Sequence, residues 1–221
     1  MFFINEYNKS LTKKFLIMIT FIVVIVVYTW LMFVDGNDSQ IKGDFIRRMI
    51  LVSCSIIYLL RVGIMAFIFL RRKLVWPEVV TIAIVMPIII FALLYAGGKQ
   101  SQSVNSIDII GILLYLFGSY LNTQSEYLRH IWKQKQENKG RLYTKGLFKY
   151  SMHINYFGDI VLFSGWAMIT QNAIMLLIPL LMALNFMFFI IPSLDEYLEK
   201  KYGKEFQEYA KQTKRFIPLV Y

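Results

Sequence analysis

Residues 15–34 read FLIMITFIVVIVVYTWLMFV, a run of twenty residues without a charged side chain. A helix of this length rises about 30 Å, which matches the hydrocarbon core of a bilayer. Similar apolar runs follow, so six membrane spans are expected, at residues 15–34, 49–70, 77–96, 107–121, 160–170 and 173–191. The fourth and fifth are short, and we expect their helices to continue beyond the membrane. The sequence therefore predicts an all-α, polytopic membrane helix bundle.

The composition of the whole chain agrees with a membrane protein. Of its 221 residues, 57% are hydrophobic and only 17% are charged, whereas soluble domains average about 25% charged residues. With 12 Gly, 5 Pro and one Cys, the chain does not fit the disordered, collagen-like or disulfide-scaffold classes. Residues 15–34 are too long and too far along the chain for a cleavable signal peptide, so we expect them to be retained. The single Cys54 is interpreted as a packing thiol.

The basic residues are distributed unevenly between the two sides of the predicted bundle. Nineteen of the 24 Lys and Arg residues lie in four segments, namely residues 1–14, 71–76 and 122–159 and the tail after Pro192. The positive-inside rule therefore places both termini in the cytoplasm, at the inner membrane if the protein is bacterial. The net charge of +10 then reflects topology and attraction to anionic lipid headgroups. The lipid bilayer is the expected partner, and nucleic acid is not required.

We interpret residues 1–221 as a single membrane domain with two parts of different composition. Residues 1–106 are mostly membrane helices joined by short polar turns, whereas residues 107–221 alternate helices with long polar segments. Residues 195–212 read as an amphipathic helix interrupted near Gly203. Such a helix is typical of the membrane interface. It either anchors the tail or forms a lid or floor for a cytoplasmic site.

Arg61 is the only charged residue deep within the first three predicted spans. An ionisable side chain at that depth is costly, which makes it a candidate functional residue. Tyr58 precedes it by three residues and shares its helix face. A phenol beside a guanidinium can donate a proton or stabilise an oxyanion. The alternative is a structural hydrogen bond between helices.

Polar side chains also line one face of the helix that continues from the fourth span. Asn122, Glu126, Arg129 and Lys133 follow one another at intervals of four, three and four residues, which places them on the same side of a helix. Arg141 comes after the next turn. This pattern fits either a solvated charged face or a site for a phosphorylated cofactor, whose phosphates Arg and Lys would neutralise.

The densest group of polar residues is in residues 146–159, which read GLFKYSMHINYFGD and lead directly into the fifth predicted span. His, Asn, Tyr and Asp together at the start of a membrane helix are unusual for packing alone, and Asn155 and Asp159 share a helix face. Two His and one Cys in the chain leave too few ligands for a metal site. There is no P-loop and no G-x-G-x-x-G, so a nucleotide would be held outside those folds.

Residues 146–159 resemble the C-terminal motif of steroid 5-alpha-reductase-like membrane enzymes, whose usual form is GLW-RYSRHPNYFGE. This grouping includes sterol reductases and many uncharacterised bacterial proteins. Residues 122–127 and the tail through residue 218 also resemble the family, so the likeness covers residues 107–221. It implies NADPH-dependent reduction of a carbon–carbon double bond in a hydrophobic, lipid-like substrate such as a steroid, an isoprenoid or an enone.

The resemblance also implies roles for particular residues. The family's cofactor contacts correspond here to Asn122, Glu126, Lys133, Arg141, His153, Asn155, Tyr156, Asp159 and Tyr197. The segment with Tyr58 and Arg61 weakly resembles the one that holds the catalytic Tyr. Lys133 stands where the steroid enzymes usually have Arg, and Met152 and Ile154 stand where Arg and Pro are common. The first span has no counterpart of the Gln–Glu pair that holds the steroid ketone, which argues against a steroid substrate.

Two alternatives stay open. Isoprenylcysteine carboxyl methyltransferases have a similar His/Asn/Tyr/Gly segment and an acidic pair like Asp195-Glu196, and they bind S-adenosylmethionine. That ligand has no phosphates, so the stacked Arg129, Lys133 and Arg141 favour a dinucleotide. The other alternative is a non-enzymatic transport or interaction protein, although the two halves of the chain do not match each other as transporter repeats often do.

Overall fold

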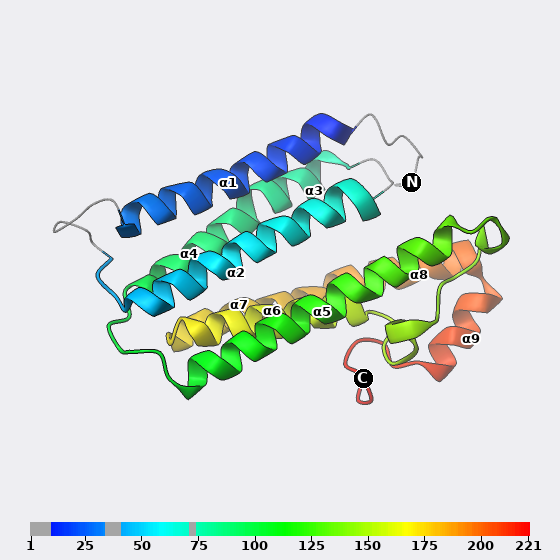
Figure 1. Ribbon diagram of the computed structural model, residues 1–221. Coiled ribbons are helices and arrows are strands. Elements are labelled where there is room, and N and C mark those ends of the chain that lie inside the picture. The colour runs from blue at the N-terminus through cyan, green and yellow to red at the C-terminus, as the bar shows by residue number, and fades with distance from the viewer. Residues whose placement is uncertain (1–9, 34–40, 71–73) are drawn as a thin grey trace. The chain divides into compact units, whose positions relative to one another are not determined.

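The computed structural model describes residues 10–33, 41–70 and 74–221 (Figure 1). These ranges contain helices and connecting segments and no β-strand. Within them, five helices are long and apolar enough to cross a membrane, namely Leu11–Phe33, Phe45–Phe69, Trp76–Gly98, Ser106–Gln134 and Ala173–Tyr202. The prediction of an all-α membrane helix bundle is therefore confirmed. Val34 and residues 1–9 and 71–73, which entered the predictions above, lie outside the described residues.

The remaining expected span, residues 160–170, belongs to the shorter helix α6 (Ile154–Ile169). Its 16 residues rise about 24 Å, less than the roughly 30 Å of a hydrocarbon core. The helix begins before its apolar run, so that the polar residues Asn155 and Asp159 lie within its first two turns. The six expected spans thus correspond to five long helices and one short one among the described residues.

The chain divides into two compact units, each of which is described by itself. The first contains Met1–Gly111 and Trp166–Met175, and the second contains Ile112–Gly165 and Leu176–Tyr221. In the first unit, three helices pack against one another, namely α1 (Leu11–Phe33), α2 (Phe45–Ile64) and α4 (Met86–Gly98) (Figure 1). A π-helical turn at Met65–Phe69 extends α2, and another at Thr81–Val85 joins α3 (Trp76–Val80) to α4. Cys54 is buried in α2, as predicted for a packing thiol.

A buried ion pair joins α2 to the first turn of α5 (Ser106–Gln134) in the first unit. Arg47 donates from Nε to Asp108 Oδ1 at 3.0 Å and from Nη2 to Oδ2 at 2.9 Å, and neither side chain is exposed. Gln171 also donates to Asp108 Oδ2, at 2.6 Å. A two-bond contact between Arg and a carboxylate is both strong and geometrically specific. It therefore fixes the relative position of these two helix ends.

In the second unit, the backbones of α5 and α6 touch at two glycines. A Cβ atom on Gly118 would overlap the backbone nitrogen of Leu162 and the carbonyl oxygen of Gly158. A Cβ atom on Gly158 would lie 2.7 Å from the backbone nitrogen of Asn122. Small residues allow membrane helices to approach this closely. Only glycine fits at these two positions without moving one helix away from the other.

The rest of the second unit follows α6. Helix α7 (Leu177–Asn185) continues through the π-helical segment Phe186–Ile190 into α8 (Ile191–Tyr202). Gly203 ends α8 with φ at +54°, and the chain restarts as α9 (Lys204–Gln212). Because this φ lies in the left-handed region, glycine is the residue that adopts it at little cost. The predicted interruption of the tail helix near Gly203 is confirmed.

We expect Asp108→Ala to lower the free energy of unfolding by about 3–5 kcal/mol, because it leaves the Arg47 guanidinium buried without a carboxylate. Denaturant unfolding in a neutral detergent, followed by tryptophan fluorescence, measures this loss. The double variant Arg47→Met/Asp108→Leu should recover part of it, since no charge then stays buried. A double variant no more stable than the single one would contradict this account of the pair.

Candidate functional site

Four of the predicted cofactor residues meet in one hydrogen-bonded network in the second unit. Asn122 Nδ2 on α5 donates to the backbone oxygen of Asn155 and to Asp159 Oδ2, both at 3.0 Å. Asn155 Nδ2 on α6 donates to Glu126 Oε1, also at 3.0 Å. Asn122 is 3% exposed and Glu126 5%. Asn122 and Glu126 are therefore buried, whereas Asn155 and Asp159 are partly buried, and hydrogen bonds hold the four side chains together.

Helical spacing and the glycine contact explain why these four residues meet. Asn122 lies one turn beyond Gly118 on α5, and Glu126 lies one further turn along the same face. Asn155 and Asp159 lie on either side of Gly158 in α6. Short amide and carboxylate side chains bridge two helices only when the backbones are close together. The Gly118–Gly158 contact provides that closeness.

Two cations extend the network along α5. Arg129 Nη2 donates to Glu126 Oε2, and the Arg129 guanidinium carbon lies 5.4 Å from the centre of the Phe148 ring. Arg129 and Lys133 line a hollow of about 50 Å³. Its other lining residues are mostly apolar, namely Leu142, Tyr143, Phe148, Met152, Leu198 and Tyr209. Two of the four polar residues predicted on one face of this helix, Arg129 and Lys133, thus line a hollow and place positive charge on its wall.

Tyr209 on α9 closes part of this hollow. Its hydroxyl donates to the backbone oxygen of Phe148 at 2.6 Å. Burial raises the pKa of the Tyr209 phenol, and this effect exceeds the opposite effect of the nearby Arg129 charge. Tyr209 therefore stays a neutral hydrogen-bond donor at physiological pH.

A second polar group is centred on His153, which immediately precedes α6. His153 is 2% exposed, and its Nε2 lies 2.7 Å from Asp195 Oδ1 on α8. Arg215 Nε donates to the other oxygen of this carboxylate at 2.7 Å. Asp195 therefore bridges a buried histidine and a cation of the tail. The His153 ring also stacks on Tyr156, and Tyr156 stacks on Phe186 with ring centres 4.7 Å apart.

Sequence reasoning missed Asp195 and Arg215 as site residues. Asp195 was considered only as part of the acidic pair that the methyltransferase alternative requires. A usable signal was its position, because it is the first acidic residue after the last apolar run. Arg215 had no such signal, since its contact with Asp195 spans 20 positions of the chain.

Five of the nine predicted cofactor residues lie outside the four-residue network, and two of them, His153 and Tyr156, belong to the second polar group. The Arg141 side chain is 66% exposed, and its Nε lies 4.0 Å from Glu205 Oε1 on α9. Tyr197 is half-buried on α8, with Lys201 Nζ 5.5 Å from the centre of its ring. Lys133 lines the small hollow of about 50 Å³ described above.

The two predicted catalytic residues lie together in the first unit. Tyr58 is 6% exposed and its ring lies between Phe21 and Trp166, with ring centres 5.9 and 5.7 Å away. Arg61 is 8% exposed, and its guanidinium carbon lies 5.3 Å from the centre of the Tyr58 ring. The phenol and the guanidinium thus share a helix face inside an aromatic surrounding.

Most of the chain matches a known protein family. Residues 67–213, which are more than half of it, match a family described as "Protein of unknown function (DUF1295)". The chain belongs to this family. In this DUF1295 protein, the matched residues include all nine predicted cofactor residues but not the proposed catalytic pair Tyr58 and Arg61.

Curated relatives confirm the resemblance to the steroid 5-alpha-reductase-like superfamily. The chain is 29% identical over 115 residues to 3-oxo-5-alpha-steroid 4-dehydrogenase 2 of Homo sapiens, which covers 51% of this chain and 42% of the relative. It is 25% identical over 167 residues to 3-oxo-5-alpha-steroid 4-dehydrogenase 1 of Bos taurus, covering 68% and 63%. It is 23% identical over 128 residues to Protein-S-isoprenylcysteine O-methyltransferase B of Arabidopsis thaliana, covering 57% and 65%. The chain thus spans less than two thirds of the length of each of these relatives.

We expect Asp195→Asn to lower the free energy of unfolding by about 2 kcal/mol, because it weakens the charge-assisted hydrogen bonds to His153 and Arg215. Thermal unfolding in detergent measures the change. The neighbouring Glu196→Gln is the matched control, because Glu196 is 67% exposed and pairs with the exposed Lys200, so its unfolding midpoint should not move. Equal midpoints for the two variants would show that the Asp195 bridge does not stabilise the second unit.

Proposed function

We propose that this DUF1295 protein is a membrane-embedded, NADPH-dependent reductase of a carbon–carbon double bond in a lipid-like substrate. The observation that carries the proposal is the hydrogen-bonded network of Asn122, Glu126, Asn155 and Asp159, with Arg129 and Lys133 beside it. The two relatives named 3-oxo-5-alpha-steroid 4-dehydrogenase support it.

The donors and acceptors of this site fit a phosphorylated dinucleotide. Asn122 Oδ1 is buried and has no hydrogen-bond partner among the described residues, so it is open to a donor group of a ligand. Arg129 and Lys133 would neutralise phosphates. A dinucleotide is larger than the hollow of about 50 Å³, so only part of it would be enclosed there. We propose contacts to it from the other predicted residues, namely Arg141, His153, Tyr156 and Tyr197.

NADPH, when bound, supplies a hydride to the substrate. We propose that Tyr58 supplies the proton, because a phenol beside the Arg61 guanidinium can stabilise charge that develops on a substrate oxygen. The aromatic rings of Phe21 and Trp166 around Tyr58 exclude water from this phenol. A hydrophobic substrate would reach such a residue from the bilayer, since the surrounding helices are apolar enough to span it.

We also propose that the network and the basic segments around it face the cytoplasm, and that both termini do so. Seven basic residues lie between residues 122 and 159, and cytoplasmic segments of membrane proteins carry such an excess. A cytoplasmic site would have direct access to a soluble coenzyme.

An S-adenosylmethionine-dependent methyltransferase is the second candidate function. It is favoured by the buried pair of His153 and Asp195, since Asp195 belongs to the acidic pair that resembles those enzymes, and by the relative named as a methyltransferase. The phosphate-free ligand leaves Arg129 and Lys133 without a role, which is why we favour the reductase.

Ligand-dependent thermal stability of the protein in neutral detergent tests the proposal. We expect NADPH to raise the unfolding midpoint and S-adenosylmethionine to leave it unchanged. Asn155→Ala and Arg141→Ala should each weaken NADPH affinity roughly tenfold, because each removes one polar contact. Lys139→Ala is the matched control for Arg141, as an exposed basic residue nearby in the same segment, and should bind NADPH normally.

The other outcomes separate the alternatives. Stabilisation by S-adenosylmethionine and not by NADPH would select the methyltransferase. Stabilisation by neither ligand would contradict both enzyme proposals and favour a transport or interaction role. Normal NADPH binding by both Asn155→Ala and Arg141→Ala would show that the site assignment is wrong.

A further inference from the structure

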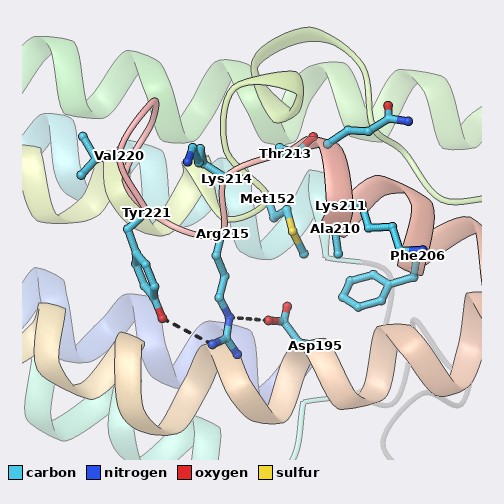
Figure 2. Close-up of a pocket in the computed structure, with 11 residues that line it drawn as sticks. Met152, Asp195, Phe206, Ala210, Lys211, Thr213, Lys214, Arg215, Val220 and Tyr221 are labelled. Carbon is cyan, nitrogen blue, oxygen red and sulfur yellow. Dashed lines mark hydrogen bonds and ion pairs between the residues drawn. The ribbon is translucent and has the colours of Figure 1, made fainter.

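A larger hollow of about 480 Å³ is lined by Met152 and Asp195 together with residues of α9 and the tail (Figure 2). Residues from α8, from the end of α9 and from the tail line it, together with Met152. None of the nine predicted cofactor residues is part of this lining. The residues that line this hollow are therefore separate from those predicted to contact a cofactor.

Hydrogen bonds to backbone oxygens of the tail hold it in place beside this hollow. Lys214 O accepts a hydrogen bond from the backbone nitrogen of Met152 at 2.8 Å, and Phe216 O accepts one from Ser151 Oγ at 2.7 Å. The Phe216 side chain is only 2% exposed. Because the backbone on both sides of Arg215 is fixed, the side chains of Lys214 and Arg215 line the hollow in a defined arrangement (Figure 2).

The charge of the lining is positive. Three cations, Lys211, Lys214 and Arg215, line the hollow together with one carboxylate, Asp195. That carboxylate already accepts Arg215 Nε on one oxygen and lies 2.7 Å from His153 Nε2 on the other. Lys211 is in the last turn of α9, where a cation also complements the helix dipole. Even so, Lys214 and Arg215 leave an excess of positive charge that suits an anion.

Apolar side chains accompany these cations. Phe206 and Met152 line the hollow and are 5% and 7% exposed. Val220, which also lines the hollow, is 70% exposed, and the adjacent Leu219 is 81% exposed. Exposed apolar side chains next to basic ones are typical of a surface that lies in a membrane interface. A lining of apolar side chains and cations fits an amphipathic anion better than it fits a fully polar anion.

The position of the hollow along the chain agrees with a membrane surface. The helix through residues 173–202 is apolar enough to span a bilayer. It becomes charged at Asp195, four residues after Ile191, so Asp195 marks the level at which the helix leaves the hydrocarbon. The hollow thus lies beside the part of this helix where the apolar run ends.

We propose that this hollow binds the phosphate headgroup of an anionic membrane phospholipid. Lys214, Arg215 and Lys211 contact the phosphate, and Leu219 and Val220 contact the upper part of the acyl chains. The proposal does not depend on the reductase activity, because it concerns a different set of residues and a different ligand.

Lipid titration of the full-length protein in neutral detergent tests this inference. The probes are short-chain phosphatidylglycerol, short-chain phosphatidylcholine and inorganic phosphate, and native mass spectrometry counts the bound molecules. Phosphatidylglycerol should bind at least about tenfold more tightly than phosphatidylcholine, and the double variant Lys211→Gln/Lys214→Gln should lose most of this preference. The matched control Lys135→Gln/Lys139→Gln removes the same charge from exposed positions outside the hollow and should bind as the wild type does.

A second variant tests the apolar half of the site without changing any charge. Leu219→Ser/Val220→Ser should weaken phosphatidylglycerol binding severalfold while the unfolding midpoint stays the same. Equal binding of the two lipids would overturn the proposal, as would an equal loss in the control lysine variant, which would indicate general electrostatic attraction. Inorganic phosphate binding as tightly as phosphatidylglycerol would also overturn it, because the ligand would then be a soluble phosphate compound.

Discussion

The contact between the backbones of α5 and α6 at Gly118 and Gly158 is the constraint on which the candidate site depends. In a bilayer, helices are not driven together by the hydrophobic effect, so close packing and interhelical hydrogen bonds determine how they associate. The glycines provide the packing, and the Asn122, Asn155 and Asp159 bonds one turn away provide the hydrogen bonds. Neither works without the other, because these polar groups would be costly to bury if the helices moved apart.

The same constraint explains why polar side chains gather at this end of the two helices. A network that satisfies most of its own polar atoms fixes the positions of Glu126 and, through it, Arg129. Arg129 and Lys133 then present positive charge to a hollow that is otherwise mostly apolar. This combination of fixed acceptors and nearby cations suits a ligand with both amide and phosphate groups. It underlies our preference for NADPH over S-adenosylmethionine, although relatives of both enzyme types resemble the chain.

Features of the fold that follow from local periodicity could be predicted from the sequence alone. Apolar runs predicted the helix bundle, and spacing by whole turns predicted that Asn122 and Glu126 share a face. Contacts between distant segments were not predictable in this way. No pattern in the sequence singled out Arg47 or Asp108, yet they form a fully buried ion pair across 61 positions of the chain. Likewise, the family resemblance predicted Arg141 as a cofactor contact, but its side chain is exposed and lies beside Glu205. This partner belongs to α9 and comes near Arg141 only when the chain folds.

The effect of Gly118→Leu on both stability and coenzyme response tests this account most directly. We predict that the variant has a lower unfolding midpoint than the wild type and that NADPH no longer raises it, because the added side chain would separate α5 from α6. Gly63→Ala is the comparison, since its added methyl group would meet the flexible side chain of Met18 at 3.3 Å, and it should behave as the wild type does. A Gly118→Leu protein with wild-type stability and a wild-type response to NADPH would contradict the central role of the glycine contact.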